Sequence, residues 1–500
     1  HGLRPLATPA PPLGRPVMLS ALILWPWLVA LWLAGRAQDS HRLAVPAALF
    51  ELLLALAVLF GADTPDSRAL HLPLLGYLWY LQNSSLGATL AVTAAALLPF
   101  ALLFAWRLEE FRGFAIAALV LVGALMGTFF SQNFLGFYLF YEIVALSGAW
   151  MILIGGDRDR AAALRFLLYT VGGSLLLLVA VLYLYLRNGN TNGIYSFSWT
   201  HLAAAAAPDP DLAWWLFLAM LAGLAVKLPL FPLHSWAGPA YGRAAPPVSM
   251  LLSGAAVLAG AYGLIHWAIP LLPLGALYFA PYGILLGAIG TLYAAFLALD
   301  APNLRRFAAW VSVSHMNLVA IGLFALQEQA VHGALFLLVA HAVLAAGLFG
   351  VIAILEARGL PGHWDALGGL FRQTPQLGAW MLFFFLTGMG LPGLANFPGE
   401  FLSLAGAFRV SPWPAAIAAL GILLSVVVFL RAYERVMLGP LNPGIARGTG
   451  DLAGRELALL WALGLLCLWL GLDPQPLLGQ FQGLLPIHSA VLFGGVAHGH

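Results

Sequence analysis

The stretch Val226-Lys-Leu-Pro-Leu-Phe-Pro-Leu-His-Ser-Trp236 decides the fold, because it places a lysine and two prolines at the end of an apolar run. A second stretch, Leu391-Pro-Gly-Leu-Ala-Asn-Phe-Pro-Gly-Glu400, combines two prolines with a glutamate. Proline removes a backbone hydrogen-bond donor and clashes with the preceding turn of a helix. Irregular backbone is tolerated in a bilayer only where protein or a water-filled cavity surrounds it. Both stretches therefore predict broken membrane helices beside a polar path.

The composition of the 500-residue chain excludes a soluble protein. Its residues are 62% hydrophobic and 8% charged, and the mean hydropathy is +0.92. A soluble protein covers itself with far more charge, so most of this chain faces lipid or other helices. Because a membrane helix needs about 20 apolar residues, the sequence predicts an all-α polytopic membrane protein with about 14 transmembrane helices. The apolar runs lie near 18–34, 43–61, 86–106, 113–130, 133–155, 163–186, 211–232, 246–268, 276–299, 304–325, 330–356, 377–408, 413–433 and 454–473.

The two broken spans are the seventh and the twelfth of this series, so they lie five spans apart and run in opposite directions. Such a pair is typical of inverted-topology repeats with an ion path at their interface. We therefore expect two inverted five-helix repeats, spans 4–8 at 113–268 and spans 9–13 at 276–436. The expected remainder is an N-terminal extension at 1–17, peripheral spans 1–3 at 18–112 with an extramembrane loop at 62–85, the last span at 454–473 and a C-terminal tail at 474–500.

The distribution of arginine predicts how the chain sits in the membrane. The loops after odd-numbered spans carry 16 arginines, whereas the other face, which includes both termini, carries 5. Cytoplasmic loops of membrane proteins carry the excess of Lys and Arg. We therefore expect both termini on the outer, periplasmic side of the inner (plasma) membrane of a bacterium.

Several classes of function are excluded by what the chain lacks. The net charge of +2 is spread over short loops, which gives no support for nucleic-acid binding. The single cysteine, Cys467, excludes a disulfide framework and sites built from several cysteines, such as iron–sulfur clusters. No glycine-rich phosphate loop follows a strand and opens a helix. We expect the chain to hold no cofactor, no metal and no catalytic residue of its own.

Ionisable residues inside the apolar runs are the candidates for function. A charged group at the centre of a bilayer costs about 2.5–3.5 kcal/mol, so each one calls for a reason. Five such residues occur together, and they are expected to transfer protons: Glu142, Lys227, His315, His341 and Glu400. Lys227 is the only lysine of the chain, and a desolvated lysine can lose its proton, whereas an arginine does not. Secondary candidates are His234, Ser249 and Arg165.

The roles of these groups leave alternatives open. Glu142 and Lys227 have opposite charges and can pair, in which case moving one of them away would release a proton. His315 and His341 suit the middle of a proton path because histidine titrates near neutral pH. Each histidine can instead be a buried side chain that bonds a helix carbonyl, and the charged residues can form a static ion pair that holds helices together.

The residues that surround these candidates resemble a known family. The motifs are Phe140-Tyr-Glu142, Val226 to Trp236, Gly260-Ala-Tyr-Gly263, Asn303-Leu-Arg-Arg306, Ser312-Val-Ser-His-Met316 and Gly390 to Phe401. From about residue 115 to 460 the chain is similar to the antiporter-like subunits of respiratory complex I and of Mrp cation/proton antiporters. The glutamate in Gly399-Glu-Phe401 and the stretch Asp451 to Glu456 resemble the M type of complex I subunit.

The resemblance implies a proton channel without a redox centre, driven by partner subunits of an NADH-quinone oxidoreductase. By position, Glu142 and Lys227 match the family's fifth-span glutamate and seventh-span lysine. His315 and His341 match histidines of the central polar axis, and Glu400 matches the acid that passes protons outward. The chain departs from the family at Leu258, where an eighth-span lysine is usual. It departs again at 237–246, which lacks the family's acid and histidine after Trp236.

Three other functions remain open. The chain could be the proton-conducting membrane half of a two-component bicarbonate uptake complex with a large, zinc-dependent soluble partner. It could be an Mrp-type sodium/proton antiporter subunit, or a scaffold that no longer conducts. The expected surroundings are the lipid bilayer, protons, and either other membrane subunits of a multi-subunit complex or the one large soluble partner.

Overall fold

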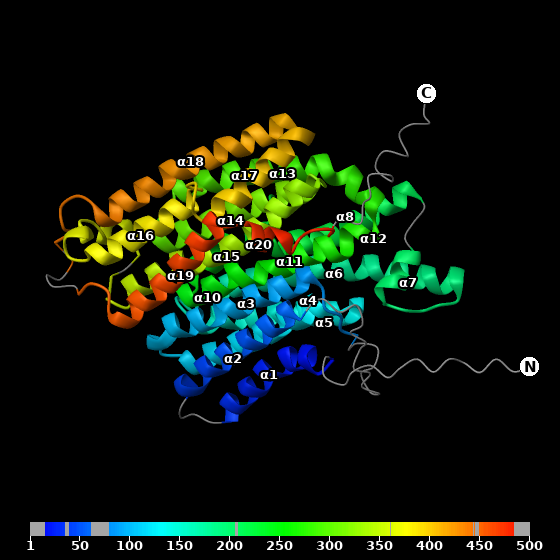
Figure 1. Ribbon diagram of the computed structural model, residues 1–500, viewed down its shortest axis with the longest axis horizontal. Helices are drawn as coiled ribbons and strands as arrows, with labels where there is room; N and C mark the ends of the chain where they lie inside the picture. The colour runs from blue at the N-terminus through cyan, green and yellow to red at the C-terminus, as the bar shows by residue number, and fades with distance from the viewer. Residues whose placement is uncertain are drawn as a thin grey trace, which may run out of the picture.

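The computed structural model describes residues 16–35, 40–61, 80–205, 209–360, 362–443, 445 and 450–484. This part of the chain is helical, and its β-bridges are isolated pairs such as that between Leu81 and Ser131. The helices lie side by side along the long axis of the molecule, with α1 and α2 at one edge and α18 at the other (Figure 1). The expected extension at 1–17 and loop at 62–85 fall largely outside the described residues.

Thirteen helices of the described part are long and apolar enough to cross a membrane. They are α1 (Pro16–Gly35), α2 (Ser40–Phe60), α3 (Ser85–Phe104), α4 (Phe111–Phe130), α5 (Phe134–Ile154), α6 (Arg160–Asn192), α8 (Pro210–Lys227), the composite span Pro246–Leu271, α13 (Pro273–Leu299), α14 (Leu304–Phe324), α15 (Glu328–Glu356), α18 (Pro412–Met437) and α19 (Gly454–Leu472). The twelfth expected span is present as two shorter helices, α16 (Pro375–Gly388) and α17 (Asn396–Val410). The all-α architecture and the expected breaks in spans 7 and 12 are therefore confirmed.

Short elements join or interrupt these spans. The helices α7 (Trp199–Ala204), α9 (Ala237–Arg243) and α20 (Gln475–Gly479) lie between or after them, so the expected C-terminal tail begins with a helical turn. Single 3₁₀ turns lie at Ala105–Arg107, Trp364–Ala366 and Leu370–Arg372. The composite eighth span consists of α10 (Pro246–Leu251), a π-helical turn at Leu252–Ala256, α11 (Val257–Gly263), a second π-helical turn at Leu264–Ala268 and α12 (Ile269–Leu271).

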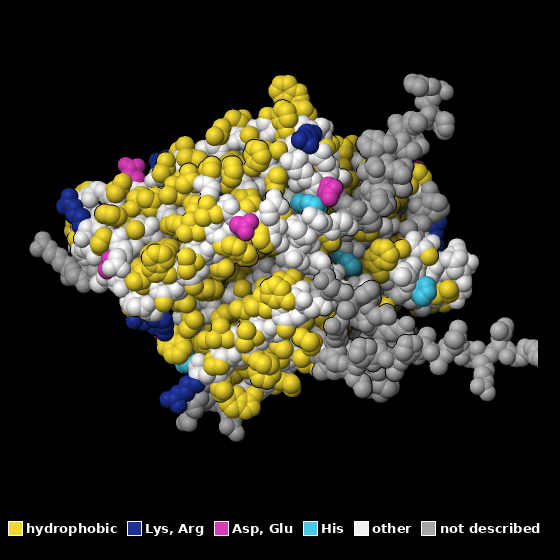
Figure 2. Space-filling view, viewed as in Figure 1, with side chains coloured by type: hydrophobic (Ala, Val, Ile, Leu, Met, Phe, Trp, Pro, Cys, Tyr) yellow, Lys and Arg dark blue, Asp and Glu magenta, His cyan; other side chains and the backbone are white. Residues whose placement is uncertain are grey.

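Burial separates the centre of the bundle from its lipid-facing rim. Nearly all residues of α14, α15 and the composite eighth span are buried, whereas most residues of α2, α18 and α19 are at least partly exposed. Large apolar side chains such as Trp413 and Leu53 point outward from the rim, as expected where lipid replaces water. Figure 2 shows apolar side chains over the middle of one face, with arginine mainly toward its left-hand end.

The break in the seventh span is held by Asn317 of α14. Helix α8 ends at Lys227, and the chain is irregular before α9 begins. The Nδ2 of Asn317 donates to the carbonyl of Pro229 at 3.2 Å, and its Oδ1 accepts from the backbone N–H of Phe231 at 3.0 Å. Asn317 is fully buried. Its one amide therefore satisfies two backbone groups that the break would leave unpaired inside the membrane.

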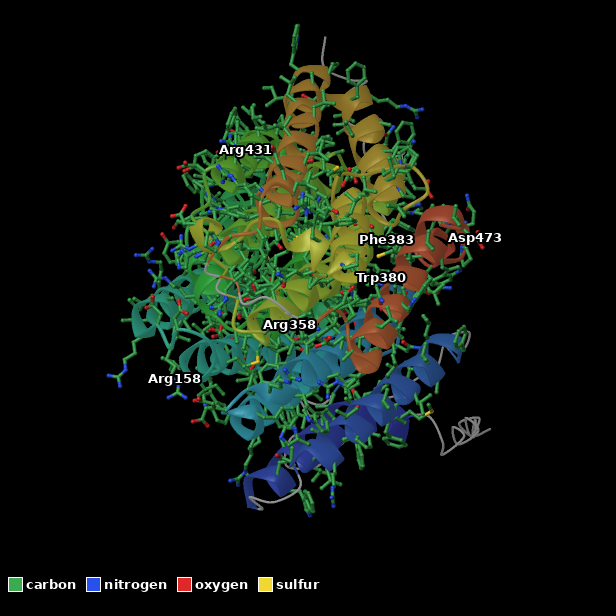
Figure 3. The ribbon with its side chains drawn as sticks, turned by 90° about the vertical axis from the view of Figure 1, so that its left-hand side faces the viewer. Arg158, Arg358, Trp380, Phe383, Arg431 and Asp473 are labelled. Atoms are coloured by element: carbon green, nitrogen blue, oxygen red, sulfur yellow. The ribbon has the colours of Figure 1, made fainter. Side chains whose placement is uncertain are left out.

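Helix α19 covers the break in the twelfth span. The break runs from 389 to 395, and a Cβ added to Gly471 of α19 would lie 2.3 Å from the carbonyl oxygen of Gly393. Only glycine permits this approach of two backbones. Trp380 of α16 packs edge-on against Trp461 of α19, and Figure 3 shows Trp380 and Phe383 on the side of α16 that faces α19.

Ion pairs tie the helices together at the arginine-rich end. Arg305 of α14 forms a two-pronged pair with Glu356 at the end of α15 and donates to Asp157 at 3.2 Å. Arg358 forms a similar pair with Glu456 of α19, with contacts of 2.6 and 3.1 Å. Forked arginine–carboxylate pairs have defined geometry as well as charge attraction. They fix the ends of α14, α15 and α19 relative to one another.

Removal of the Asn317 amide should destabilise the folded protein. In Asn317→Ala the Pro229 carbonyl and the Phe231 N–H lose their partner, and each unpaired buried group costs about 1–3 kcal/mol. We expect a clearly lower unfolding midpoint in detergent solution, measured by circular dichroism. The matched control is Ser147→Ala, because that buried hydroxyl bonds only carbonyls of its own helix. Equal midpoints for the two variants would contradict the proposed role of Asn317.

Candidate functional site

The buried polar side chains of the central helices form two groups. The lysine cluster consists of Lys227 of α8 and Tyr141 of α5, together with the half-buried Glu142 that follows Tyr141 in the sequence. The histidine cluster consists of His315 of α14, His341 of α15, and Asn396 and Glu400 of α17. All five primary candidates from the sequence therefore belong to one of the two clusters.

Lys227 is bound by Tyr141 and not by Glu142. Its Nζ donates to the backbone carbonyl of Tyr141 at 2.7 Å and lies 3.4 Å from the centroid of the Tyr141 ring. Only 3% of Lys227 is exposed. A carbonyl dipole and the negative face of an aromatic ring both stabilise an ammonium group. The lysine is thus held at the place where α8 breaks.

The direct ion pair between Glu142 and Lys227 that the opposite charges suggest is not formed in the described structure. The Lys227 Nζ is instead turned toward the Tyr141 carbonyl. Glu142 is half-buried, and its Oε1 is buried without a hydrogen-bond partner among the described residues. This carboxylate oxygen can therefore still accept a hydrogen bond.

The histidine cluster is a compact arrangement of four groups. His315 Nε2 lies 3.4 Å from Glu400 Oε1, 3.4 Å from Asn396 Nδ2 and 3.2 Å from the carbonyl of Gly388. The His315 and His341 rings lie 5.1 Å apart between centroids. All four side chains are at most 5% exposed. The break in the twelfth span makes the cluster possible, because it frees the Gly388 carbonyl and turns Asn396 and Glu400 toward His315.

Several atoms of the histidine cluster have unused bonding capacity. Both ring nitrogens of His341, Nδ1 of His315 and Oδ1 of Asn396 are buried and have no protein partner among the described residues. Buried polar groups are nearly always hydrogen-bonded to protein or to water. Ring nitrogens that are not committed to a carbonyl can accept and release protons. These four buried atoms can therefore still form hydrogen bonds to water.

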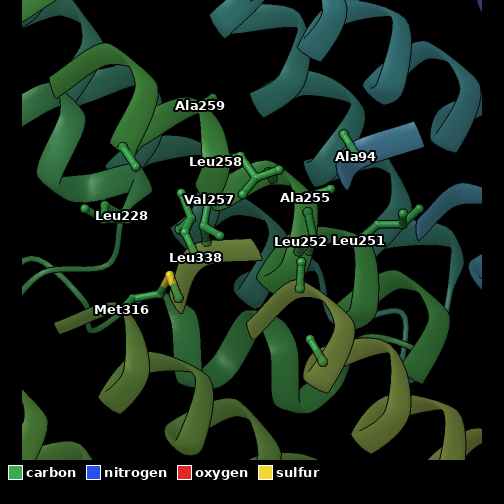
Figure 4. Packing of buried hydrophobic residues seen from close by; sticks show 14 of the residues in the cluster. Ala94, Leu228, Leu251, Leu252, Ala255, Val257, Leu258, Ala259, Met316 and Leu338 are labelled. Atoms are coloured by element: carbon green, nitrogen blue, oxygen red, sulfur yellow. The ribbon is translucent and has the colours of Figure 1, made fainter. Parts of the chain in front are cut away.

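An apolar cluster adjoins both polar clusters. It consists of Leu228, Val257, Leu258, Met316 and Leu338, each at most 1% exposed. Figure 4 shows Val257, Met316 and Leu338 close together, with Leu228 and Leu258 beside them. Leu228 follows Lys227 in the chain, Met316 follows His315, and Leu338 lies one turn before His341. Apolar side chains therefore lie next to both polar clusters along the chain.

Leu258 contributes to this cluster from an unusual helix. It lies in α11, between the π-helical turns Leu252–Ala256 and Leu264–Ala268. Such turns are rare and occur frequently at functional sites. The backbone is irregular on both sides of α11 even though Leu258 is apolar and cannot carry a proton.

The three secondary candidates lie outside both clusters. His234 lies within the seventh-span break and packs among the rings of Phe231, Tyr293 and Trp310. Ser249 Oγ donates to the Tyr241 carbonyl at 2.7 Å, which is a local bond between helix ends. Arg165 is exposed on α6. Their part in proton transfer stays a prediction.

Sequence reasoning missed three buried polar residues: Asn317, Asn396 and Glu51. The two asparagines escape such reasoning because amides do not titrate, although both lie inside or beside motifs with charged groups. Glu51 of α2 is fully buried, and neither carboxyl oxygen has a hydrogen-bond partner among the described residues. A lone carboxylate within the apolar run 43–61 is the signal that could have identified it.

Comparison with known proteins gives consistent results. Residues 131–426 match the family described as NADH:quinone oxidoreductase/Mrp antiporter, TM. NADH-quinone oxidoreductase subunit M of Rhodobacter capsulatus is 31% identical over 481 residues, which cover 92% of this chain and 93% of that protein. A chain of respiratory complex I from Thermus thermophilus with bound NADH is 31% identical with a TM-score of 0.84, covering 93% of this chain and 99% of that one. A chain of the Mrp complex from a Dietzia species shares the fold, with 19% identity and a TM-score of 0.80 over 96% of this chain and 98% of that one.

The two clusters should respond differently to paired substitutions. His315→Ala and Glu400→Ala remove groups 3.4 Å apart, so we expect their effects on unfolding free energy to be non-additive by about 0.5–3 kcal/mol. Lys227→Ala combined with Glu400→Ala should be additive, because the two side chains share no partner. Equilibrium unfolding in detergent measures both cycles. Strong coupling in the second cycle would contradict the separation into two clusters.

Proposed function

Because the chain belongs to the NADH:quinone oxidoreductase/Mrp antiporter family, we propose that it is a proton-translocating M-type membrane subunit of a complex I-like NADH-quinone oxidoreductase. Partner subunits supply the electron transfer and drive the movement of protons. This chain supplies a path through the membrane, built from Glu142, Lys227, His315, His341 and Glu400.

The histidine cluster is the observation that carries this proposal. A proton relay needs donors and acceptors within hydrogen-bond reach of one another, directly or through one water. His315 Nε2 is 3.4 Å from Glu400 Oε1, and His341 has both ring nitrogens uncommitted to protein partners within the described structure. A scaffold would gain nothing from such unpaired buried groups, each of which costs stability.

The lysine cluster supplies a charge that responds to its surroundings. Lys227 holds a proton while the Tyr141 carbonyl and ring face its Nζ. A displacement of α5 against α8 removes these contacts and favours release of the proton, because an isolated ammonium group is unstable in an apolar interior. On this proposal Glu142, one residue after Tyr141, accepts or supplies that proton.

The apolar cluster separates the two steps. Leu258 stands where the family usually has a lysine, so a proton crosses from the lysine cluster to His341 or His315 only when water enters between Leu228 and Leu338. Such an entry requires movement of the α8 break. Asn317 bonds that break and lies two residues after His315, so one side chain connects both regions.

Lys227→Ala should strongly slow proton translocation while the protein still assembles. The variant removes the only group of the lysine cluster that carries a positive charge, and losing a positioned proton carrier should lower the rate at least about tenfold. A pH-sensitive dye in sealed vesicles that contain the complete complex measures the rate. The matched control is Arg372→Ala, which removes an exposed charge at the arginine-rich end. Unchanged translocation in assembled Lys227→Ala would overturn the assignment of the path.

The partners distinguish this proposal from the other functions that the sequence leaves open. We expect mass spectrometry after purification in mild detergent to find homologous membrane subunits together with iron–sulfur and flavin proteins. One large soluble zinc protein would instead indicate bicarbonate uptake. A set of membrane subunits without redox proteins would indicate an Mrp-type antiporter.

A further inference from the structure

We propose that Glu51 of α2 is a proton-binding site, separate from the two polar clusters. The folded chain holds one proton on this carboxyl group at neutral pH, and the proton exchanges with water only when α1 and α2 move away from the bundle. Glu51 lies in the second of the three peripheral spans. The inference therefore goes beyond the proposed proton path and does not depend on it.

The carboxyl group of Glu51 is buried without a partner. Glu51 is fully buried, and neither Oε1 nor Oε2 has a hydrogen-bond partner within the part of the chain that the structure describes. Two other acids, Glu356 and Glu456, each form a two-pronged pair with an arginine. An isolated carboxylate in an apolar interior is so unstable that the group takes up a proton instead. We therefore expect Glu51 in its neutral, protonated form.

The helices around Glu51 supply no compensating charge. Helix α2 packs mainly against α3, α1 and α4. The sequences of α1 and α3 contain no ionisable residue. The one charged residue of α4 is Arg112, in its first turn, and its guanidinium donates to carbonyls at the end of α1. On α2 itself, His41 and Arg42 lie in the first turn, about 14 Å from Glu51 along the helix axis.

Small side chains and two hydrogen bonds hold α2 against its neighbours on both sides of Glu51. The buried face of α2 consists of Ser40, Ala44, Ala47, Ala48, Glu51, Ala55 and Val58. Small residues let helices approach closely, which keeps bulk water away from the carboxyl group. Trp25 Nε1 of α1 donates to the carbonyl of Ala47 at 3.1 Å, four residues before Glu51. Asn83 Nδ2, ahead of α3, donates to the carbonyl of Val58 at 3.3 Å.

The position of α2 at the edge of the molecule gives the proton a way to exchange. Helices α1 and α2 form one edge of the bundle, and Phe50 and Leu53 are exposed on the outer side of α2 (Figure 1). Separation of α1 and α2 from α3 would admit water to Glu51. The O–H bond then breaks, the proton passes to water, and the carboxylate keeps the electron pair. Before α2 can pack again, the carboxylate must take a proton back.

Infrared spectroscopy of the full chain, purified in detergent, tests whether Glu51 carries a proton. Glu51→Gln replaces the acid by a neutral amide of the same shape. We expect the difference spectrum between wild type and Glu51→Gln at neutral pH to contain the C=O stretching band of a protonated carboxyl group. The matched control is Glu109→Gln, which removes an exposed carboxylate and should change carboxylate bands only. Carboxylate bands in the Glu51→Gln difference spectrum would overturn the proposal.

The pH dependence of unfolding is a second test. A glutamate in the unfolded chain loses its proton above about pH 4.3, whereas the folded chain keeps the proton on Glu51. Because the folded state then binds more protons than the unfolded state, its stability falls as the pH rises. Relative to Glu51→Gln, the unfolding equilibrium constant of wild type should rise about tenfold for each pH unit between about pH 5 and 7. A ratio that does not change with pH would contradict the proposal.

Two further comparisons keep the result unambiguous. The ratio of unfolding constants between wild type and Glu109→Gln should change little with pH, because that carboxylate is exposed in the folded chain as well. If Glu51→Gln does not fold, Glu51→Leu repeats both measurements with a neutral, apolar side chain. Both measurements report on Glu51 itself, so their outcome is independent of the effect of Lys227→Ala on proton translocation.

Discussion

The need to satisfy every backbone polar group inside a bilayer is the constraint on which this structure depends. Two spans break where prolines and glycines interrupt an apolar run, and each break exposes carbonyls that a continuous helix would have paired. The Asn317 amide meets this need in the seventh span, and the His315 ring meets part of it in the twelfth. The residues that repair the backbone are therefore the same residues, or their neighbours, that form the polar clusters.

Much of the fold could be predicted from the sequence, because lipid selects long apolar helices. The predicted last span at 454–473 is the helix Gly454–Leu472, and the predicted tenth span at 304–325 is Leu304–Phe324. The proline pairs correctly located both breaks. The π-helical turns beside Leu258 could not be predicted, because no local pattern of apolar residues distinguishes them from ordinary helix.

The sequence could predict most of the residues that belong to the candidate site, but not the contacts that they make with one another. Apolar runs reveal that Lys227, Glu142 and His315 are inside the membrane, yet they do not give the relative heights and rotations of α5, α8 and α14. Those heights bring the ammonium group of Lys227 to the Tyr141 carbonyl instead of the neighbouring carboxylate. The same limit explains why Asn396 was missed, since its contact with His315 arises only when the twelfth span breaks and folds against α14.

The apolar cluster has an electrical consequence. A membrane stores energy as a difference in proton concentration and voltage, and a continuous file of water through one subunit would discharge it. The side chains of Leu228, Val257, Leu258, Met316 and Leu338 fill the space beside both polar clusters with hydrocarbon, which conducts no protons. If the chain translocates protons as proposed, this apolar packing interrupts the path at rest, and a copy without its driving partners would not leak protons across the membrane.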